Sequence, residues 1–228
     1  MKVIGLIGGL SWESTSLYYK HINTLTLSQY NHNAKLVLYS MDFGEVTNLL
    51  QNQQYEEVQN QLVQVAKKIE CSGADCILMC SNTVHQFAEE VEQAISIPLL
   101  HIGDVSAEEI VEHDVKRIGL LGTKQTMEQD FYKTRLANYD VETIIPKEDE
   151  RNFIHHVILH ELSKGIISQQ SKVRFLQIIQ KLIENGAEGI LLGCTEIPLL
   201  ISQKDISIPV FDTAFLHAKT AVQFADNR

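Results

Sequence analysis

The 228-residue sequence has few of the residues that mark disulfide-rich, disordered or membrane-spanning proteins. Its four cysteines form no CxxC motif, so we expect no disulfide framework and place the protein in a reducing cytoplasm. Its 4 prolines and 12 glycines are too few for a disordered or fibrous chain. No apolar run reaches the roughly 18–20 residues that a membrane helix needs, and the start MKVIGLIGGL is interpreted as a strand rather than a signal peptide.

Positive charge is also scarce. The chain has 19 Lys and Arg against 29 Asp and Glu, which gives a formal net charge of −10. Such a surface is a poor partner for nucleic acid or an anionic membrane, so we expect neither. The hydrophobic share of 44% is that of a globular protein, and the length suits one large domain or two small ones.

The sequence repeats itself at an offset of 113–114 residues. Residues 2–8 (KVIGLIG) and 116–122 (KRIGLLG) are identical at five of seven positions. Residues 73–83 (GADCILMCSNT) and 186–196 (GAEGILLGCTE) are identical at four of eleven. Because the matches keep one order, we interpret the chain as two copies of a similar unit.

Each half alternates short apolar strands with amphipathic helices, which predicts an α/β fold with parallel sheets. Helical spacing is expected around residues 55–69 and 173–183, and a glycine suited to a left-handed cap follows each, at Gly73 and Gly186. An Ile-Pro pair opens a further strand in each half, at residues 97 and 208.

We predict two pseudo-symmetric α/β domains with a cleft between them. The first covers residues 1–103 together with 212–228, where a C-terminal helix returns to it. The second domain covers residues 104–211.

The chemistry is expected at the carboxyl ends of the repeated strands, where ligands bind in open α/β sheets. These ends carry Ser81-Asn82-Thr83 in the first half and Cys194-Thr195-Glu196 in the second. Backbone N–H groups just after a strand and before a helix favour a carboxylate. The sequence therefore predicts a small acidic ligand between the halves, with a hydroxyl on one side and a thiol on the other.

Cys194 is the strongest candidate for a catalytic residue. At a strand end and a helix N-terminus its thiolate is favoured, so we expect a pKa below the ordinary value of about 8.5. Cys80 is no equivalent partner, because side chains alternate along a strand and Cys80 points away if Ser81 points into the cleft. Cys71, Cys76 and Cys80 are interpreted as structural residues.

Motifs for cofactors and metals are weak or missing. The run Gly5-Leu6-Ile7-Gly8-Gly9 is not the dinucleotide pattern GxGxxG, and we interpret it as a loop that approaches the cleft closely. His156 and His160 are spaced i, i+4, but an HExxH motif would need a second His where Lys164 stands. We therefore expect a solvated helix face and no metal site.

Four stretches together resemble the aspartate/glutamate racemase superfamily: IGLIGGLSWES at 4–14, SNT at 81–83, TMEQDFY at 126–132 and LGCTE at 192–196. The resemblance implies a cofactor-independent amino-acid racemase with two pseudo-symmetric α/β domains and a small amino acid as substrate. It also implies a homodimer, since members of the family are often dimeric.

In that family two cysteines flank the substrate α-carbon, one in a Cys-Asn-Thr motif and one in Gly-Cys-Thr-Glu. Cys194 matches the second, but Ser81 stands where the family has the first cysteine. Some members with a similar N-terminal stretch carry a hydroxyl residue there.

The resemblance also implies a set of substrate-binding residues. The α-carboxylate and amino group are expected on Asn82, Thr83 and Thr195, and a distal carboxylate on Lys164. This favours aspartate or glutamate, although an Arg that some relatives use has no clear counterpart near Asn48. The full predicted set is Gly9, Leu10, Asn82, Thr83, Thr126, Lys164, Thr195 and Glu196.

We hypothesise that Cys194 removes the α-proton of one enantiomer, with Ser81 or a relayed water on the opposite face. The chain would then interconvert L- and D-aspartate, or the glutamate enantiomers. One alternative is a one-cysteine decarboxylase of the same superfamily. Another is a catalytically weak protein that binds acidic amino acids; the N-terminal match makes a hydantoin racemase or maleate isomerase less favoured.

Overall fold

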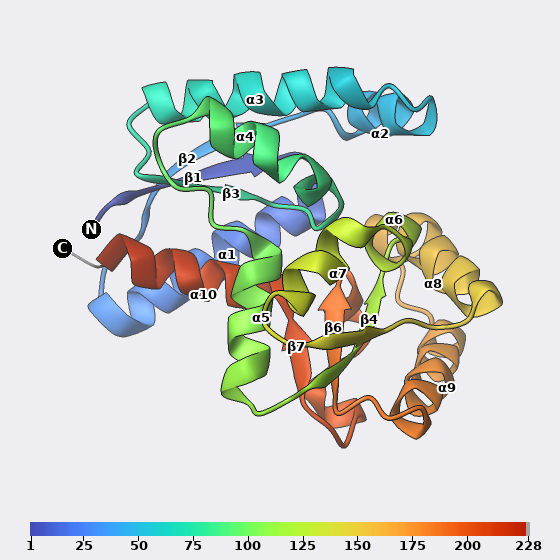
Figure 1. Ribbon diagram of the computed structural model, residues 1–228. Coiled ribbons are helices and arrows are strands. Elements are labelled where there is room, and N and C mark those ends of the chain that lie inside the picture. Colours follow the sequence, from blue (N-terminus) through green and yellow to red (C-terminus); the bar gives the residue numbers. More distant parts are fainter. Residues whose placement is uncertain (227–228) are drawn as a thin grey trace. The chain divides into compact units, whose positions relative to one another are not determined.

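The computed structural model describes residues 1–226, which fold as two compact units (Figure 1). The first unit comprises residues 1–102 and the segment from His217 onward, and the second comprises residues 103–216. The division falls at the start of α5 (Ile102–Glu112) and inside α10 (Thr213–Asp226). No helix in residues 1–226 is long and apolar enough to cross a bilayer.

The first unit is built on a three-stranded parallel sheet with the strand order β2-β1-β3. Its elements before α5 are β1 (Val3–Gly8), α1 (Trp12–Tyr30), β2 (Lys35–Ser40), α2 (Phe43–Gln51), α3 (Tyr55–Cys71), β3 (Cys76–Met79), η1 (Thr83–Phe87) and α4 (Ala88–Ala94). Figure 1 shows α1 and α3 on opposite sides of this sheet.

Packing of α3 on the sheet follows from its apolar stripe. Val58, Leu62 and Ile69 lie on one face of the helix and are buried in a core with residues of β1 and β3. Gly5 in β1 allows this close contact, because a Cβ atom there would come within 2.4 Å of Ile69. The buried strands are apolar on both faces because helices cover both sides of the sheet.

The second unit holds a four-stranded parallel sheet with the order β5-β4-β6-β7. Its elements after α5 are β4 (Arg117–Gly122), α6 (Lys124–Glu128), α7 (Asp130–Ala137), β5 (Glu142–Ile144), α8 (Glu148–His160), η2 (Leu162–Lys164), α9 (Gln169–Glu184), β6 (Gly189–Gly193), η3 (Ile197–Leu199), η4 (Gln203–Asp205) and β7 (Val210–Asp212).

The sequence repeat corresponds to a repeat of hydrogen bonds. Val3 at the start of β1 donates its N–H to Asp75 Oδ2 over 2.6 Å, and Lys116 before β4 donates to Glu188 Oε2 over 2.7 Å. Gly73 and Gly186 both adopt positive φ, 87° and 93°, as expected for left-handed caps. The prediction of an α/β fold with two parallel sheets is confirmed.

The strand expected at Ile97-Pro98 is shorter than its counterpart in the second unit. It makes one parallel bridge, Ile77 with Leu99, whereas Val210 opens the three-residue strand β7. The carbonyl of Leu100 instead accepts a hydrogen bond from His217 Nε2 over 2.6 Å, and α5 begins at Ile102. The predicted C-terminal helix is confirmed as α10, and residues 227–228 of that prediction lie outside the described residues.

Candidate active site

The first group of candidate residues lies at the carboxyl end of β6. Cys194 follows Gly193, the last residue of the strand, and its side chain is buried. The Cys194 thiol donates a hydrogen bond to Glu196 Oε2 over 2.9 Å. The Thr195 hydroxyl donates to the same oxygen over 2.8 Å. The cysteine, the hydroxyl and the carboxylate therefore form one connected, buried group.

Close backbone packing brings Thr126 to the same strand end. A Cβ atom on Gly193 would lie 3.2 Å from Thr126 Cγ2 and 3.0 Å from the carbonyl oxygen of Leu121. A Cβ atom on Gly122 would lie 3.1 Å from Thr126 Cβ. Glycine at these two positions lets the fully buried Thr126 pack against the ends of β4 and β6, next to Cys194.

The predicted low pKa of Cys194 is wrong. Burial raises the pKa of the thiol well above its ordinary value, and the negative charge of Glu196 and the hydrogen bond to it raise the pKa further. Backbone N–H groups of Thr195 and Glu196 lower it, as the sequence suggested, but they are outweighed. The expected helix is also short, because the segment after Glu196 forms only the three-residue helix η3.

For Glu196, a contact with the substrate stays a prediction. Its Oε2 atom already accepts hydrogen bonds from Cys194 and Thr195, so its contact in the structure is with the thiol. With the proton on sulfur, Cys194 is an acid. With that proton moved to Glu196, the sulfur is a base, so the coupled pair can work in either direction.

The second group of candidate residues lies at the carboxyl end of β3, in the first unit. Ser81 is half-buried whereas Cys80 is fully buried, which agrees with the predicted alternation. Burial also raises the pKa of the Cys80 thiol. Asn82 is buried and Thr83 is half-buried at the start of η1. Their roles toward a substrate stay predictions.

The remaining cysteines differ from each other. Cys76 lies within β3, and burial is the main cause that raises its pKa to about 12. Cys71 is exposed at the last position of α3. Cys71 is therefore the one described cysteine that lies on the surface.

The glycine-rich turn after β1 has a reason in the fold itself. Gly9 has φ 78°, and a Cβ atom there would come within 2.1 Å of the Met41 carbonyl oxygen. Its N–H donates to Thr15 Oγ1 over 2.8 Å. Leu10 is buried in the core on the α3 side. The close approach that the sequence indicates at Gly9 is thus an approach of the chain to itself, and a substrate contact there stays a prediction.

Lys164 is the exposed member of the predicted set in the second unit. It ends η2, and Gly165 follows with φ 70°, in agreement with the predicted helix end. Thr126, Thr195 and Glu196, by contrast, are all buried. A contact of Lys164 with a distal carboxylate stays a prediction.

Sequence reasoning missed three buried histidines close to Ser81. His85, His101 and His217 are each at most 5% exposed. The His85 ring lies 4.8 Å from that of His101 and 5.7 Å from that of His217, between ring centroids. No spacing in the sequence connects these positions, because tertiary packing alone brings them together.

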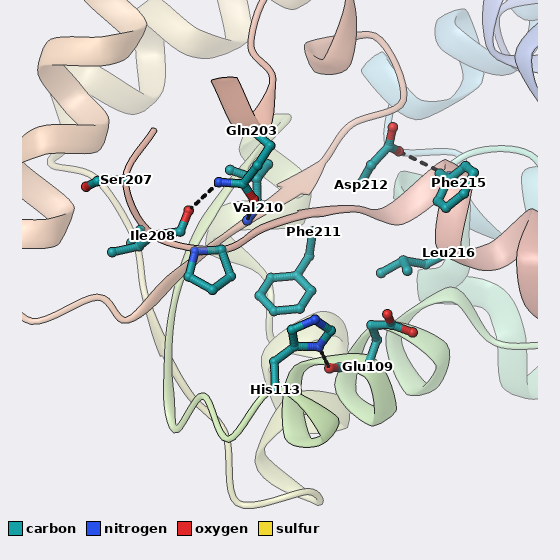
Figure 2. A pocket seen from close by; sticks show the side chains of 11 residues that line it. Glu109, His113, Gln203, Ser207, Ile208, Val210, Phe211, Asp212, Phe215 and Leu216 are labelled. Atoms are coloured by element: carbon teal, nitrogen blue, oxygen red, sulfur yellow. Dashed lines mark hydrogen bonds between the residues drawn. The ribbon is translucent and has the colours of Figure 1, made fainter. Parts of the chain in front are cut away.

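The second unit also has a surface pocket of about 500 Å³ beside β7 (Figure 2). Glu109 and His113 of α5 line one side, and His113 packs edge-on against Phe211 at 5.4 Å between ring centroids. Within the described part of the chain, the lining includes none of the predicted site residues.

Two units, each with a parallel sheet, define an α/β architecture, and a buried thiol–carboxylate pair lies at the end of one strand. The sequence matches the Asp/Glu/Hydantoin racemase family over residues 7–221. The chain belongs to this family and is thus an isomerase of the racemase type.

Individual relatives are similar over most of the chain. A crystal structure of a candidate Asp/Glu racemase from Yersinia pestis has 42% sequence identity and a TM-score of 0.93, over 99% of both chains. An aspartate racemase homologue from Pyrococcus horikoshii OT3 has 35% identity and a TM-score of 0.88, over 100% of both chains. The broad specificity amino-acid racemase RacX of Bacillus subtilis is 28% identical over 74% of this chain and 72% of its own length.

Proposed function

We propose that this protein is a cofactor-independent racemase that interconverts the L- and D-enantiomers of aspartate or glutamate in the cytoplasm. The observation that carries the proposal is the buried Cys194–Glu196 pair at the end of β6. Racemisation requires a group that can both remove and return a proton at carbon, and this pair has one transferable proton held between sulfur and oxygen.

In the proposed reaction, the Cys194 proton first moves to Glu196. The sulfur then takes the α-proton from one face of the amino acid, and the electron pair of the broken C–H bond stays on the substrate. Ser81, or a water next to it, gives a proton to the other face and regains one from solvent, and Glu196 releases the proton that it received to solvent. The reverse reaction runs the same steps backward, which returns the proton from Cys194 to the α-carbon.

Ser81 is the weaker partner in this scheme, because a hydroxyl is a much weaker acid than a thiol. The two enantiomers have equal free energy, so kcat/KM must be the same in both directions. A slow step at Ser81 therefore lowers kcat/KM in both directions, while kcat and KM can differ separately.

Aspartate and glutamate are the proposed substrates because the buried polar groups at both strand ends suit an α-amino acid and Lys164 supplies a cation for a second carboxylate. The names of the aspartate racemase homologue and of RacX support an amino-acid substrate. A broad substrate range is included in the proposal, since RacX is described as a racemase of broad specificity.

The test is to incubate the purified protein with each enantiomer of aspartate and glutamate, with EDTA and without added cofactor, and to follow the enantiomer ratio by chiral chromatography. We expect both enantiomers of at least one amino acid to approach a 1:1 mixture. Release of CO₂ from an arylmalonate without racemisation would support the decarboxylase alternative instead. Tight binding of the amino acid without conversion would support a binding protein.

We also propose that the enzyme is a homodimer joined through β2. Within the described residues, β2 pairs only with β1, so its outer edge is open. An antiparallel pair of two such strands about a twofold axis can place Leu38 opposite Leu38 of the second copy and Val37 opposite Tyr39, since opposed residues lie on the same face of the sheet. This register puts no two like charges together, and the apolar residues of the strand face each other.

A further inference from the structure

The three buried histidines of the first unit have no part in the reaction proposed above. They come from separate places in the chain: His85 from η1, His101 from the segment before α5, and His217 from α10. All three belong to the first unit, and the His85 ring contacts the other two at 4.8 Å and 5.7 Å between centroids.

His217 is held in one neutral form. Its Nε2 atom lies 2.6 Å from the Leu100 carbonyl oxygen, and a carbonyl can only accept, so Nε2 carries the hydrogen. Nδ1 lies 2.8 Å from the Tyr18 hydroxyl, which donates to it. Burial lowers the pKa of His217 to about 4, so the ring is neutral in the physiological range. One side of the His85 ring thus faces a rigid neighbour.

His85 connects this group to Ser81. Its Nδ1 atom lies 2.8 Å from the Ser81 carbonyl oxygen, so Nδ1–H is the donor. The preceding carbonyl, that of Cys80, accepts a hydrogen bond from Ser14 Oγ over 2.7 Å. The Ser81 N–H donates to the Met79 carbonyl over 2.8 Å. Two side-chain donors therefore hold the turn, and His85 is the one that acts on Ser81 itself.

We infer that His85 is a positioning residue, which holds the Ser81 turn in place for proton transfer while His101 and His217 hold the His85 ring. The inference rests on the proposed function, because it assumes that the Ser81 segment serves one face of the substrate. A misplacement of about 1 Å can slow a reaction by about 100-fold. Because a hydroxyl is a weak acid, proton donation by Ser81 is already slow and depends strongly on the position of the hydroxyl. Cys194 follows β6 in the second unit, so proton removal by its thiol does not depend on His85.

The test compares His85→Asn with His85→Gln. An Asn amide nitrogen can take the place of Nδ1 and keep the bond to Ser81, whereas the longer Gln places its amide near the Nε2 position. Both variants are polar and close in size. The readout in D₂O is α-proton exchange by NMR together with inversion by chiral chromatography, for each enantiomer of the substrate.

We expect H85Q to invert both enantiomers about 10- to 100-fold more slowly than the wild type. It should still exchange, at a rate within about twofold of the wild type, the enantiomer whose proton Cys194 removes, because only the Ser81 face is disturbed. H85N should keep inversion within about fivefold, since it keeps the donor. His85→Leu, which has a similar volume and no donor, takes the place of H85Q if that variant does not fold.

Equal inversion rates in H85N and H85Q would overturn the inference, and so would an equal loss of exchange for both enantiomers. A wild-type protein that exchanges neither enantiomer would remove the proposed function, and the inference with it. An active wild type with an H85Q variant unchanged in inversion would remove the inference alone.

Discussion

A single atom, Glu196 Oε2, accepts hydrogen bonds from both Cys194 and Thr195 in the buried end of β6. A second negative charge on sulfur would be costly there, because the site is poorly solvated and the carboxylate is adjacent. The resting thiol is therefore protonated. A proton acceptor beside it is what the proposed reaction needs, and Glu196 Oε2 already accepts the hydrogen bond from the thiol.

Replacing Glu196 with Gln separates two effects of the carboxylate: it raises the pKa of Cys194, and it accepts the thiol proton in the proposed reaction. The carboxylate raises the pKa of Cys194, so E196Q should lower that pKa and make the thiol react faster with iodoacetamide at pH 8. Racemisation should become slower by about 10²–10⁴-fold, because the acceptor for the thiol proton is gone.

The alkylation rates are measured against pH in a Cys71→Ser background, which removes the exposed thiol. Faster alkylation together with slower racemisation is the expected combination. A thiol whose pKa is unchanged or higher in E196Q would contradict the role given to the carboxylate.

Ser81 and Cys194 could be singled out as candidates from the sequence because they occupy equivalent positions in a repeat that ends two buried strands. The pKa of Cys194 could not. It depends on how deeply the thiol is buried and on a carboxylate two residues away, and a sequence records neither the burial nor the direction of the Glu196 side chain.

Among the strands, the outer edges are protected to different degrees. β7 is covered by a side chain: Gln203 accepts from the Val210 N–H over 2.9 Å and donates to the Ile208 carbonyl over 3.0 Å (Figure 2). β5 is only three residues long and begins with the ion-paired Glu142. These are common ways to prevent edge-to-edge association.

β2 has neither kind of protection along its six residues. Leu38 is 45% exposed on the strand, and Trp12 and Tyr19 of α1 are more exposed still. Leu38 and Thr15 both lie beside Gly8, so the Leu38 side chain is on the α1 side of the sheet. An open, apolar edge of this kind supports the proposed pairing of two copies.

A lysine at position 38 tests that pairing. Leu38→Lys puts a positive charge from each copy in the centre of the two paired β2 strands. We therefore expect the dimer to dissociate into monomers at micromolar concentration. Val173→Lys on α9 is the matched control, because Val173 is 47% exposed in the other unit. Light scattering after size exclusion gives the mass. A monomeric wild type, or a dimer that L38K leaves intact, would contradict the β2 interface.

At the scale of the whole molecule, stability should depend on pH through His217. Its pKa is about 4 in the folded chain against an ordinary 6.5. Between these values the unfolded chain binds a proton that the folded chain does not, so the free energy of unfolding falls as the pH decreases below about 6.5.

Integrated between pH 7 and pH 5, this contribution is about 2 kcal/mol. Urea denaturation of the wild type and of His217→Asn at the two pH values measures it. The variant should lose less stability than the wild type on acidification, by about that amount. An equal loss in both proteins would show that His217 does not control the pH dependence.

The two parallel sheets could be predicted because strands covered on both faces must be apolar, and because the repeat gives each unit the same order of elements. Asp75 and Glu188 even keep the same hydrogen bonds at the two strand starts. The histidine group could not be found in this way. It forms only when His217 of α10 packs against His85 of η1, and no local sequence pattern predicts such a contact.

The most direct test of the account is α-proton exchange in D₂O with L- and D-aspartate and L- and D-glutamate, for the wild type and for Cys194→Ala. We expect the wild type to exchange the α-proton of at least one pair of enantiomers. C194A should lose that exchange by about 10²–10⁴-fold, and Cys71→Ala should keep the wild-type rate. Full exchange in C194A, or no exchange by the wild type with any of the four amino acids, would contradict the account.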